Sequence, residues 1–486
     1  MTVSTSRDRA AQRRLFRRRQ LAVGSALGIA LSLAATVSAF GWEGSTDVTG
    51  ATGPTAAGGA TPVFSVRRAP GWVGGATADR RLVAAVQPAV DSLPASSCAV
   101  VAPGGRVVAS DNADKPFAPG SNMKILTARA ALDVLGPTTT FRTDVLAAER
   151  PDGGAVAELW LVGGGDPLLS TEPFASGGKY GSDIPHTSFE SLADAVVAAG
   201  VTTVGQIRAD ETRYDDVRTV ATWPARYLAD GQVGPLSALS LNDGRQFAAS
   251  GPPAGTAPPA PDPAVYAAGV LGRLLTARGV EVGSVGTSGR APKDPESIAS
   301  VTSVPLTGIV AEMLTFSDNT TAEMLLKELG RNVESPGTTA NGLKVLGQEA
   351  ERLKLPMEGV VLVDGSGLDR GTRLRCDLLQ QVLTDDGPEG PIASGLAVAA
   401  RTGTLRDRYT KSPAAGRVRA KTGTLRDVTA LSGWVDSPSG AHVGFAIIVN
   451  LDSGQVSDDD LVATQRVTEA ALAYPDAPDR AMLGPR

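Results

Sequence analysis

Histidine is nearly absent from this chain. Its 486 residues contain only His186 and His442, and neither belongs to a nucleophile motif. A Ser-His-Asp triad is therefore not expected, whereas a lysine can serve as the base if its proton is loosened. A cluster of metal ligands and a nucleotide fingerprint are also missing, because the run Gly163–Gly165 has neither the full G-x-G-x-x-G pattern nor a Walker lysine. We therefore expect no metal and no cofactor.

Cysteine is equally scarce, with only Cys98 and Cys376 in the chain. The pair fits one disulfide bond in an oxidising compartment. Two buried free thiols fit the sequence as well, so both readings stay open.

Basic residues are concentrated at the N-terminus. The first twenty residues hold seven arginines and one aspartate, a charge of +6, so the remaining residues carry −11 to give the net charge of −5. This acidic body has no nucleic-acid footprint, and we expect no nucleic-acid partner. Residues 21–42 are uncharged, and as a helix they would span roughly 33 Å, enough for a bilayer core of about 30 Å. Segment 1–42 therefore predicts a membrane anchor or a cleaved signal peptide, and an exported body in both cases.

Composition also indicates how the rest of the chain is divided. Residues 43–77 are mostly Gly, Ala, Thr and Pro, with few large apolar side chains, and predict a flexible linker. The body that follows, about 400 residues long, is long enough for two or more domains. Residues 476–486 are expected to form a tail.

Three short motifs do stand out, and they occur in one order. They are Ser121-Asn122-Met123-Lys124, Ser317-Asp318-Asn319 and Lys421-Thr422-Gly423. This is the S-x-x-K, S-D-N and K-T-G set of active-site serine enzymes that acylate on penicillins. The set supplies a nucleophile, a base, a proton shuttle and a clamp for the substrate.

Each motif has a rival in the same sequence, and the context decides between them. Ser121 opens a stretch with apolar residues at helical spacing, whereas the S-x-x-K match at Ser176 is followed by Gly-Gly-Lys-Tyr-Gly. A serine in the first turn lies at the positive end of the helix, and Lys124 lies one turn away on the same face.

The second motif competes with Ser110-Asp111-Asn112, which we interpret as a loop, and with Ser240-Leu241-Asn242. Ser317 instead precedes an amphipathic helix, and the triplet is expected between two helices. An ordinary helix N-cap at Asn319 or Thr320 is the structural alternative.

The third motif precedes two β-rich runs, VTALSGWV and HVGFAIIVN, joined by a hairpin connection at 436–440. Lys421 is therefore expected on a strand of a sheet. The near copy Arg401-Thr402-Gly403 is followed by charged residues and is expected in a loop.

Taken together, these motifs resemble the class C low-molecular-mass penicillin-binding proteins, the D-alanyl-D-alanine carboxypeptidase/endopeptidase family. Asp364–Arg370 reads D-G-S-G-L-D-R, similar to that family's D-G-S-G-L-S-R signature with Asp369 in place of the usual serine. Gly164-Gly165-Asp166-Pro167 and the sequence GTLRDR at 403–408 are also similar to family motifs. Ser317 follows Ser121 by 196 positions, which exceeds the spacing in ordinary serine β-lactamases.

The resemblance implies an α/β fold of the penicillin-binding, serine β-lactamase-like transpeptidase type, split in sequence. Residues 78–145 and 285–475 would form the catalytic domain, and residues 146–284 would form an inserted, mainly β part. The implied activity is that of a serine D-alanyl-D-alanine carboxypeptidase, with endopeptidase action open, in the cell envelope. Its partners would be a peptidoglycan stem peptide ending in D-Ala-D-Ala, with β-lactams as covalent inhibitors, and the membrane if segment 1–42 is retained.

The resemblance also implies a role for each site residue. Ser121 would form the acyl-enzyme with Lys124 as its base, Ser317 would relay a proton, and Asn319 would hold the substrate or Lys124. Lys421, Thr422 and Thr424 would receive the terminal carboxylate, with Gly423 between them in the binding strand. The backbone N–H groups of Ser121 and Thr424 would form the oxyanion hole. A free lysine has a pKa near 10.4, so lowering it to about 7 requires about 4–5 kcal/mol; burial and a second ammonium, Lys421, both act in that direction.

Two other functions share these motifs. A β-lactamase-type hydrolase would differ in its rate of deacylation, and the long insert argues against it. A non-catalytic, penicillin-recognising wall-binding protein would keep the fold and lose a catalytic group, whereas all the expected side chains are present here.

Overall fold

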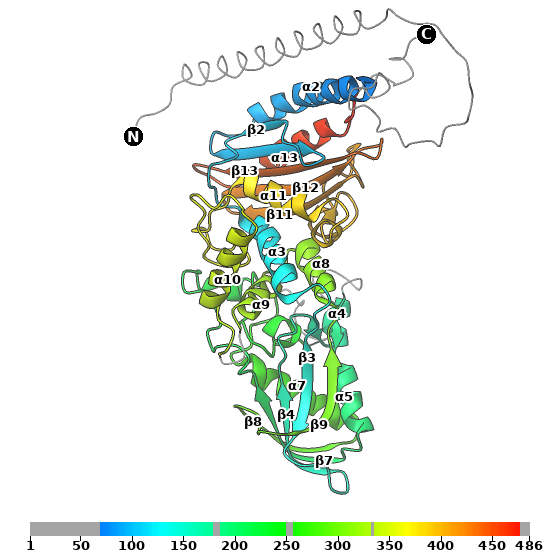
Figure 1. Ribbon diagram of the computed structural model, residues 1–486. Helices are drawn as coiled ribbons and strands as arrows, with labels where there is room; N and C mark the ends of the chain where they lie inside the picture. The colour runs from blue at the N-terminus through cyan, green and yellow to red at the C-terminus, as the bar shows by residue number, and fades with distance from the viewer. Residues whose placement is uncertain (1–68, 178–184, 249–255, 332–334, 477–486) are drawn as a thin grey trace, which may run out of the picture. The chain divides into compact units, whose positions relative to one another are not determined.

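One sheet of the protein has six antiparallel strands in the order β10-β11-β12-β13-β1-β2. The computed structural model (Figure 1) describes residues 69–177, 185–248, 256–331 and 335–476, which lie within one compact unit, Val66–Arg486. The strands are β10 (Ala397–Val398), β11 (Val418–Leu425), β12 (Val428–Asp436), β13 (His442–Asn450), β1 (Ser97–Pro103) and β2 (Ala109–Asp111).

The hairpin expected from the two apolar runs is confirmed. Strands β12 and β13 pair from Val428↔Asn450 to Asp436↔His442. Both strands are buried on both faces, which is why their sequences are almost continuously apolar rather than alternating.

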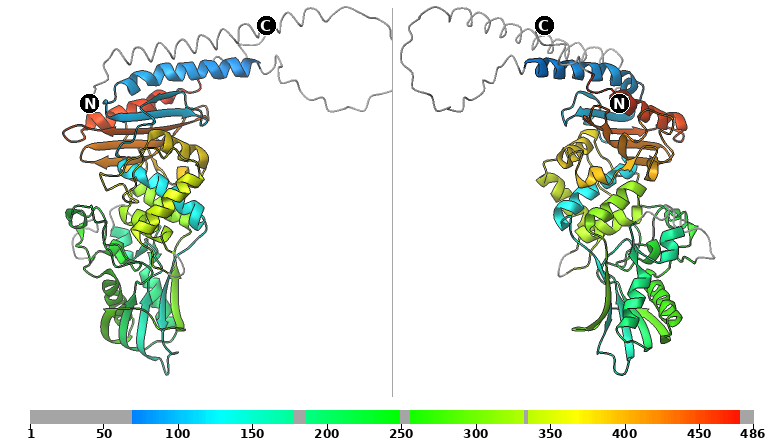
Figure 2. Two further views of the ribbon diagram at one scale, coloured as in Figure 1. Left: turned by 60° about the vertical axis from the view of Figure 1, so that its left-hand side comes forward. Right: turned by 90° about the vertical axis from the view of Figure 1, so that its right-hand side faces the viewer.

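Helices cover both faces of this sheet (Figure 2). On one face α2 and α13 contribute Leu82, Val86 and Val467 to a core with alternate residues of the strands. On the other face α11 packs directly on β1, β12 and β13. Residues of six helices share one core there with Val100, Ala430 and Trp434 of the strands. The helices are α2 (Ala69–Asp91) and α13 (Asp458–Ala471) on the first face, and α3 (Met123–Leu135), α8 (Leu306–Phe316), α9 (Asn319–Leu329), α10 (Thr339–Arg352), α11 (Cys376–Asp386) and α12 (Pro391–Ser394) on the second.

Helix α2 corrects the end of the predicted linker. The linker was expected to reach residue 77, but the helix already begins at Ala69. Its later residues Leu82, Val86 and Val90 are four apart and pack on the sheet, so the helix that they anchor continues back through the glycine-rich stretch despite the low helix propensity of glycine. The rest of the predicted linker, 43–68, and segment 1–42 lie outside the described residues.

A second sheet has five strands in the order β8-β7-β4-β3-β9, in which β4, β7 and β8 run parallel and β3 runs antiparallel to both of its neighbours. Helices α5 and α7 supply much of its core, including Phe189, Leu192 and Leu271. The expectation of a mainly β insert was therefore wrong in this respect, because helical residues cover one face of the sheet. The elements are β3 (Arg142–Ala147), β4 (Ala155–Val162), β7 (Thr203–Asp210), β8 (Glu281–Ser288), β9 (Glu296–Thr302), α5 (Phe189–Ala198) and α7 (Pro263–Ala277).

The five-stranded sheet extends beyond both predicted limits of the insert, 146 and 284, because β3 starts at Arg142 and β9 ends at Thr302. The division into a split catalytic domain and an insert stays a prediction. The remaining elements are short: β5 (Leu169–Ser170), β6 (Thr187–Ser188), α4 (Glu172–Gly177), α6 (Arg226–Ala229), η1 (Gly120–Asn122), η2 (Leu241–Gly244) and η4 (Gly403–Leu405).

Cys98 of β1 and Cys376 at the start of α11 form a disulfide bond, so the first of the two readings of the cysteine pair is confirmed. The bond joins the sheet to a helix of its second face, across 278 residues of sequence. Among the helices of the described ranges, none is long and apolar enough to cross a membrane. The hydrophobic segment 21–42 lies outside those ranges.

Candidate active site

Glycines bring three backbone segments together around Ser121. Ser121 lies in the turn η1, directly before α3. A Cβ on Gly120 would lie 3.5 Å from the backbone nitrogen of Thr424, and a Cβ on Gly423 would lie 2.7 Å from the Pro119 carbonyl oxygen. Gly367, with a φ of +78°, approaches the same turn so closely that its Cβ would lie 1.9 Å from the Gly120 carbonyl oxygen. The turn is therefore fixed between strand β11 and the loop Asp364–Arg370.

Lys124 is fully buried, and oxygen atoms of Ser121, Asn319 and Ser366 are among the partners of its Nζ. Its Nζ lies 3.0 Å from Ser121 Oγ, 2.5 Å from Asn319 Oδ1 and 2.8 Å from the backbone oxygen of Ser366. The structure thus brings three of the predicted residues together, although Asn319 is 195 residues away in sequence. A serine hydroxyl beside a buried amine is one arrangement in which an adjacent base can activate a nucleophile.

The S-D-N triplet forms the tight connection between α8 and α9. Helix α8 ends at Phe316, and Ser317 caps it with a left-handed φ of 64° and ψ of 35°. The Asp318 carboxylate caps α9 by accepting a hydrogen bond from the Thr321 amide. The cap is therefore Asp318, which leaves the Asn319 side chain available to Lys124. Asn319 Nδ2 also donates to the backbone oxygen of Gln232 at 2.6 Å. Ser317 is partly exposed.

Lys421 lies on strand β11, as predicted, and is fully buried. Its Nζ donates to the Thr422 backbone oxygen at 2.9 Å, and the Thr422 hydroxyl donates to the Thr404 hydroxyl at 2.8 Å. Burial, and then the charge of Lys124, hold the pKa of Lys421 well below its ordinary value. Thr424 is exposed at the end of the same strand. Two lysines thus share one buried site, and a ligand carboxylate would relieve their mutual repulsion.

The rival motifs lie elsewhere. Ser110 and Asp111 belong to β2, so their assignment to a loop was wrong; because β2 pairs only with β1, this triplet lies at the edge of the sheet opposite to β10 and β11. Ser176 is in the short helix α4, where its hydroxyl donates to the Glu172 carbonyl at 2.8 Å, and Lys179 lies outside the described residues. Asn242 accepts hydrogen bonds from Thr171.

The loop expected after Arg401 does contribute to the site. It contains the 3₁₀ turn η4, and Thr404 of that turn is the partner of Thr422. Because charged residues follow this threonine, its sequence context predicted an exposed loop and not a residue of the site. Two signals pointed to it, namely its near identity with the K-T-G region and the similarity of GTLRDR at 403–408 to a family motif.

The loop Asp364–Arg370 holds further residues that motif spacing did not assign. The buried Asp364 carboxylate accepts from the amides of Gly367 and Asp369, and from the Trp223 indole at 3.0 Å. Burial raises the pKa of Asp364 despite these donors. The resemblance to a family signature drew attention to this loop. It did not predict that the backbone oxygen of Ser366 contacts Lys124, because any residue type has such an oxygen.

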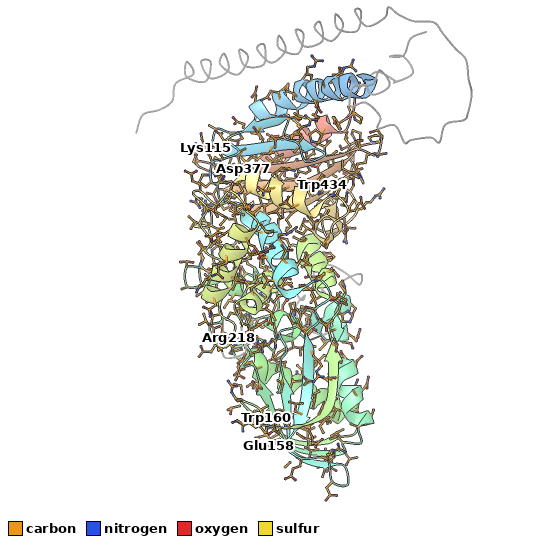
Figure 3. The ribbon with its side chains drawn as sticks, in the orientation of Figure 1. Lys115, Glu158, Trp160, Arg218, Asp377 and Trp434 are labelled. Atoms are coloured by element: carbon orange, nitrogen blue, oxygen red, sulfur yellow. A yellow bond between two sulfur atoms is a disulfide. The ribbon has the colours of Figure 1, made fainter. Side chains whose placement is uncertain are left out.

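Residues 211–234, which leave the five-stranded sheet after β7, run along α9. Lys327 of α9 is buried and paired with Asp215, and Arg213 pairs with Glu328 at 2.5 Å. In Figure 3 the labelled Arg218 lies between Trp434 of the first sheet and Trp160 of the second. These ion pairs fix the segment that presents the Gln232 carbonyl to Asn319.

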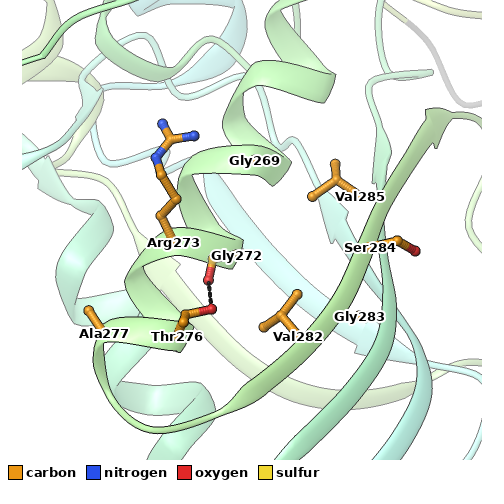
Figure 4. Close-up of a pocket in the computed structure, with 9 residues that line it drawn as sticks. All are labelled: Gly269, Gly272, Arg273, Thr276, Ala277, Val282, Gly283, Ser284 and Val285. Carbon is orange, nitrogen blue, oxygen red and sulfur yellow. Dashed lines mark hydrogen bonds between the residues drawn. The ribbon is translucent and has the colours of Figure 1, made fainter.

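A separate groove lies between α7 and β8 (Figure 4). It has a volume of about 590 Å³, and its lining includes Gly269, Arg273, Thr276, Ser284 and Val285. The lining contains no lysine, histidine or carboxylate that could activate a hydroxyl. The groove therefore has no counterpart of the Ser121–Lys124 pair.

Comparisons with known proteins cover both parts of the chain that carry the motifs. The D-Ala-D-Ala carboxypeptidase 3 (S13) family matches residues 83–256 and 246–470. A D-alanyl-D-alanine carboxypeptidase of Actinomadura sp. is 32% identical over 465 residues, 78% of this chain and 82% of that protein. Carboxypeptidase DacB of Mycolicibacterium smegmatis is 30% identical, over 72% and 75% of the two chains.

A solved structure, penicillin binding protein 4 (dacB) from Haemophilus influenzae, superposes with a TM-score of 0.64 at 19% identity. The match covers 80% of this chain and 98% of that one, which confirms the predicted penicillin-binding, transpeptidase-like α/β fold. With its fold, its motifs and its relatives in agreement, the chain belongs to the D-Ala-D-Ala carboxypeptidase 3 (S13) family, among the class C low-molecular-mass penicillin-binding proteins.

Proposed function

We propose that Ser121 is the nucleophile of this serine-type D-Ala-D-Ala carboxypeptidase and that Lys124 is its base. The observation that carries the proposal is the set of contacts at Lys124 Nζ. A neutral amine has two N–H donors and one lone pair. The oxygens of Asn319 and Ser366 can accept only the two N–H groups, which leaves the lone pair for the Ser121 hydroxyl 3.0 Å away.

In the first half-reaction, Ser121 Oγ attacks the carbonyl carbon between the two D-alanines and gives its proton to Lys124. The developing oxyanion is stabilised by the backbone N–H groups of Ser121 and Thr424, each such donor being worth about 3–4 kcal/mol. The pairing is supported because a Cβ on Gly120, the residue before Ser121, would lie in van der Waals contact with the Thr424 nitrogen, 3.5 Å away. The C–N bond then breaks, Ser317 relays a proton to the amine, and D-alanine leaves.

In the second half-reaction, water attacks the acyl-enzyme and restores the free Ser121 hydroxyl. The substrate is held through its terminal carboxylate by Lys421, Thr422 and Thr424, while Gly423 lets the strand approach the nucleophile turn. Placing a carboxylate beside the two lysines offsets the cost of their burial.

The substrate is a peptidoglycan stem peptide ending in D-Ala-D-Ala, and β-lactams act as covalent inhibitors of the same serine. A crystal structure of the H. influenzae penicillin binding protein 4 is also known in complex with a β-lactam. The long-lived acyl-enzyme follows because the opened ring stays attached, whereas D-alanine departs.

The experiment is a digest of purified peptidoglycan fragments, analysed by mass. Wild-type protein should release one D-alanine from each pentapeptide stem, and any cleavage of cross-linked dimers measures endopeptidase action directly. The Ser121→Ala protein should leave both substrates intact. Release of D-alanine by Ser121→Ala at the wild-type rate would refute the assignment.

We also place the enzyme outside the cytoplasm, in the cell envelope, where its substrate lies. Segment 1–42 would deliver it as a cleaved signal peptide or retain it as a membrane anchor, because it combines seven arginines with an uncharged stretch of 22 residues. The mass of the mature N-terminus in a membrane and a soluble fraction distinguishes the two fates. A full-length chain found only in the cytoplasm would contradict the proposal.

A further inference from the structure

Helix α9 carries two side chains, one turn apart, that are linked to Lys124, one directly and the other through the loop Asp364–Arg370. Asn319 accepts a hydrogen bond from Lys124 Nζ directly. Glu323 lies four residues later on the same face and is fully buried. Its Oε1 accepts hydrogen bonds from two successive backbone amides, Gly365 at 3.0 Å and Ser366 at 2.7 Å. None of the three sequence motifs includes this glutamate.

The two amides belong to the loop whose backbone oxygen contacts the base. With its N–H held by Glu323, residue Ser366 directs its own carbonyl oxygen to Lys124 Nζ at 2.8 Å. From the opposite side, the Thr127 hydroxyl of α3 donates to the Gly365 oxygen at 2.6 Å. The turn 365–366 is therefore held by a carboxyl from α9 and a hydroxyl from α3.

The position of the Ser366 oxygen has a chemical consequence. If that oxygen moves, one N–H of neutral Lys124 loses its acceptor, and the amine can rotate so that an N–H rather than the lone pair faces Ser121. We propose that Glu323 is a positioning residue for the base: it fixes the 365–366 turn so that the Ser366 carbonyl orients the Lys124 lone pair toward the nucleophile.

This inference rests on the proposed role of Lys124 as base. Glu323 does not contact the substrate in this account. Its role is to accept the two backbone hydrogen bonds, and it does not need a negative charge to do so. A glutamine, whose amide oxygen can accept the same two N–H groups, should therefore replace it, whereas leucine should not.

The test measures the acylation of the full chain by a fluorescent penicillin. It separates the dissociation constant of the initial complex from the first-order acylation rate constant. Glu323→Gln should acylate within about threefold of wild type. Glu323→Leu should acylate at least thirtyfold more slowly with an unchanged dissociation constant, because the carboxylate clamp on β11 is untouched. Glu349→Gln is the matched control and should behave as wild type, because this largely buried glutamate of α10 accepts its hydrogen bonds from Arg352 and not from the loop.

Thr127→Val keeps the inference testable if Glu323→Leu fails to fold. It removes the hydrogen bond on the other side of the turn without changing the side-chain shape, and it should lower the acylation rate constant about five- to tenfold. Rescue by glutamine is the readout that simple loss of packing would not produce.

Three results would overturn the inference: a wild-type rate in a folded Glu323→Leu protein, an equal loss in Glu323→Gln and Glu323→Leu, or a parallel loss of binding and acylation. If wild type itself is not labelled on Ser121, the proposed function fails instead. The two failures are thus distinguishable.

Discussion

A methyl group added at Gly367 should disable the nucleophile without unfolding the protein. Gly367 has a φ of +78°, and a Cβ there would lie 1.9 Å from the Gly120 carbonyl oxygen and 2.9 Å from Met123 Cβ. Contacts between a Cβ and a backbone oxygen are essentially never shorter than 3.0 Å. The loop and the Ser121 turn must therefore separate by about 1 Å.

Misplacing reacting groups by about 1 Å can lower a rate by about 10²-fold. We therefore expect Gly367→Ala to lower the second-order rate constant of acylation by fluorescent penicillin by about 10²-fold or more. The left-handed backbone adds a strain of about 1–2 kcal/mol, which lowers the unfolding temperature without abolishing the fold.

Gly440 provides the matched control. Its φ is +83°, and a Cβ there would meet no atom within 4 Å. Gly440→Ala carries the same backbone strain, so it should lose similar stability while acylating as wild type. Equal acylation rates for the two variants would refute the argument that backbone contact positions Ser121.

Three further predictions follow from other contacts. Replacing both Cys98 and Cys376 by alanine should lower the free energy of unfolding by up to about 5 kcal/mol, because the disulfide closes a loop of 278 residues and so restricts the unfolded chain. A loss below about 1 kcal/mol in denaturant titrations would contradict this prediction. Burial and the neighbouring Asp364 raise the pKa of Glu323 from 4.5 to about 8. Because the folded state keeps a proton that the unfolded state loses, the stability of the protein should fall as the pH rises from about 5 to about 8. Glu323→Gln should flatten this dependence in thermal melts at several pH values, and an unchanged slope would count against the prediction. Thr404→Val removes the partner of the Thr422 hydroxyl and should lower kcat/KM for D-Ala-D-Ala peptides about five- to tenfold with little change in melting temperature, which steady-state kinetics can check.

The sequence predicted the parts of the site that depend on side-chain identity at short spacing. Ser121 and Lys124 are three residues apart at the start of a helix, so their contact follows from helix geometry. The strand at Lys421 and the connection at Ser317 were predicted from the apolar patterns around them.

The remainder depends on contacts between distant backbone groups. The oxygens of Ser366 and Gln232 meet Lys124 and Asn319 across 242 and 87 residues, and a carbonyl group has no residue type that marks it. The edge strand at Ser110 was misjudged because Asp and Asn favour turns locally, whereas pairing with β1 decides the conformation.

The helical cover of the second sheet was underestimated for a similar reason. The start of α7 follows a proline-rich stretch, which favours a loop interpretation, but Pro263 occupies the first turn of the helix, where its missing N–H has no cost. Asp262 caps that helix by accepting from the Val265 amide.

Covalent capture of benzylpenicillin tests the central claim most directly. Wild-type protein should gain the mass of one inhibitor per chain, on the peptide that carries Ser121, and Lys124→Ala should slow this capture by several orders of magnitude because base and nucleophile act as a unit. Ser121→Ala should gain no mass, while Ser110→Ala and Ser176→Ala should be labelled as wild type. Label on Ser176, or label that survives in Ser121→Ala, would contradict both the site and the mechanism.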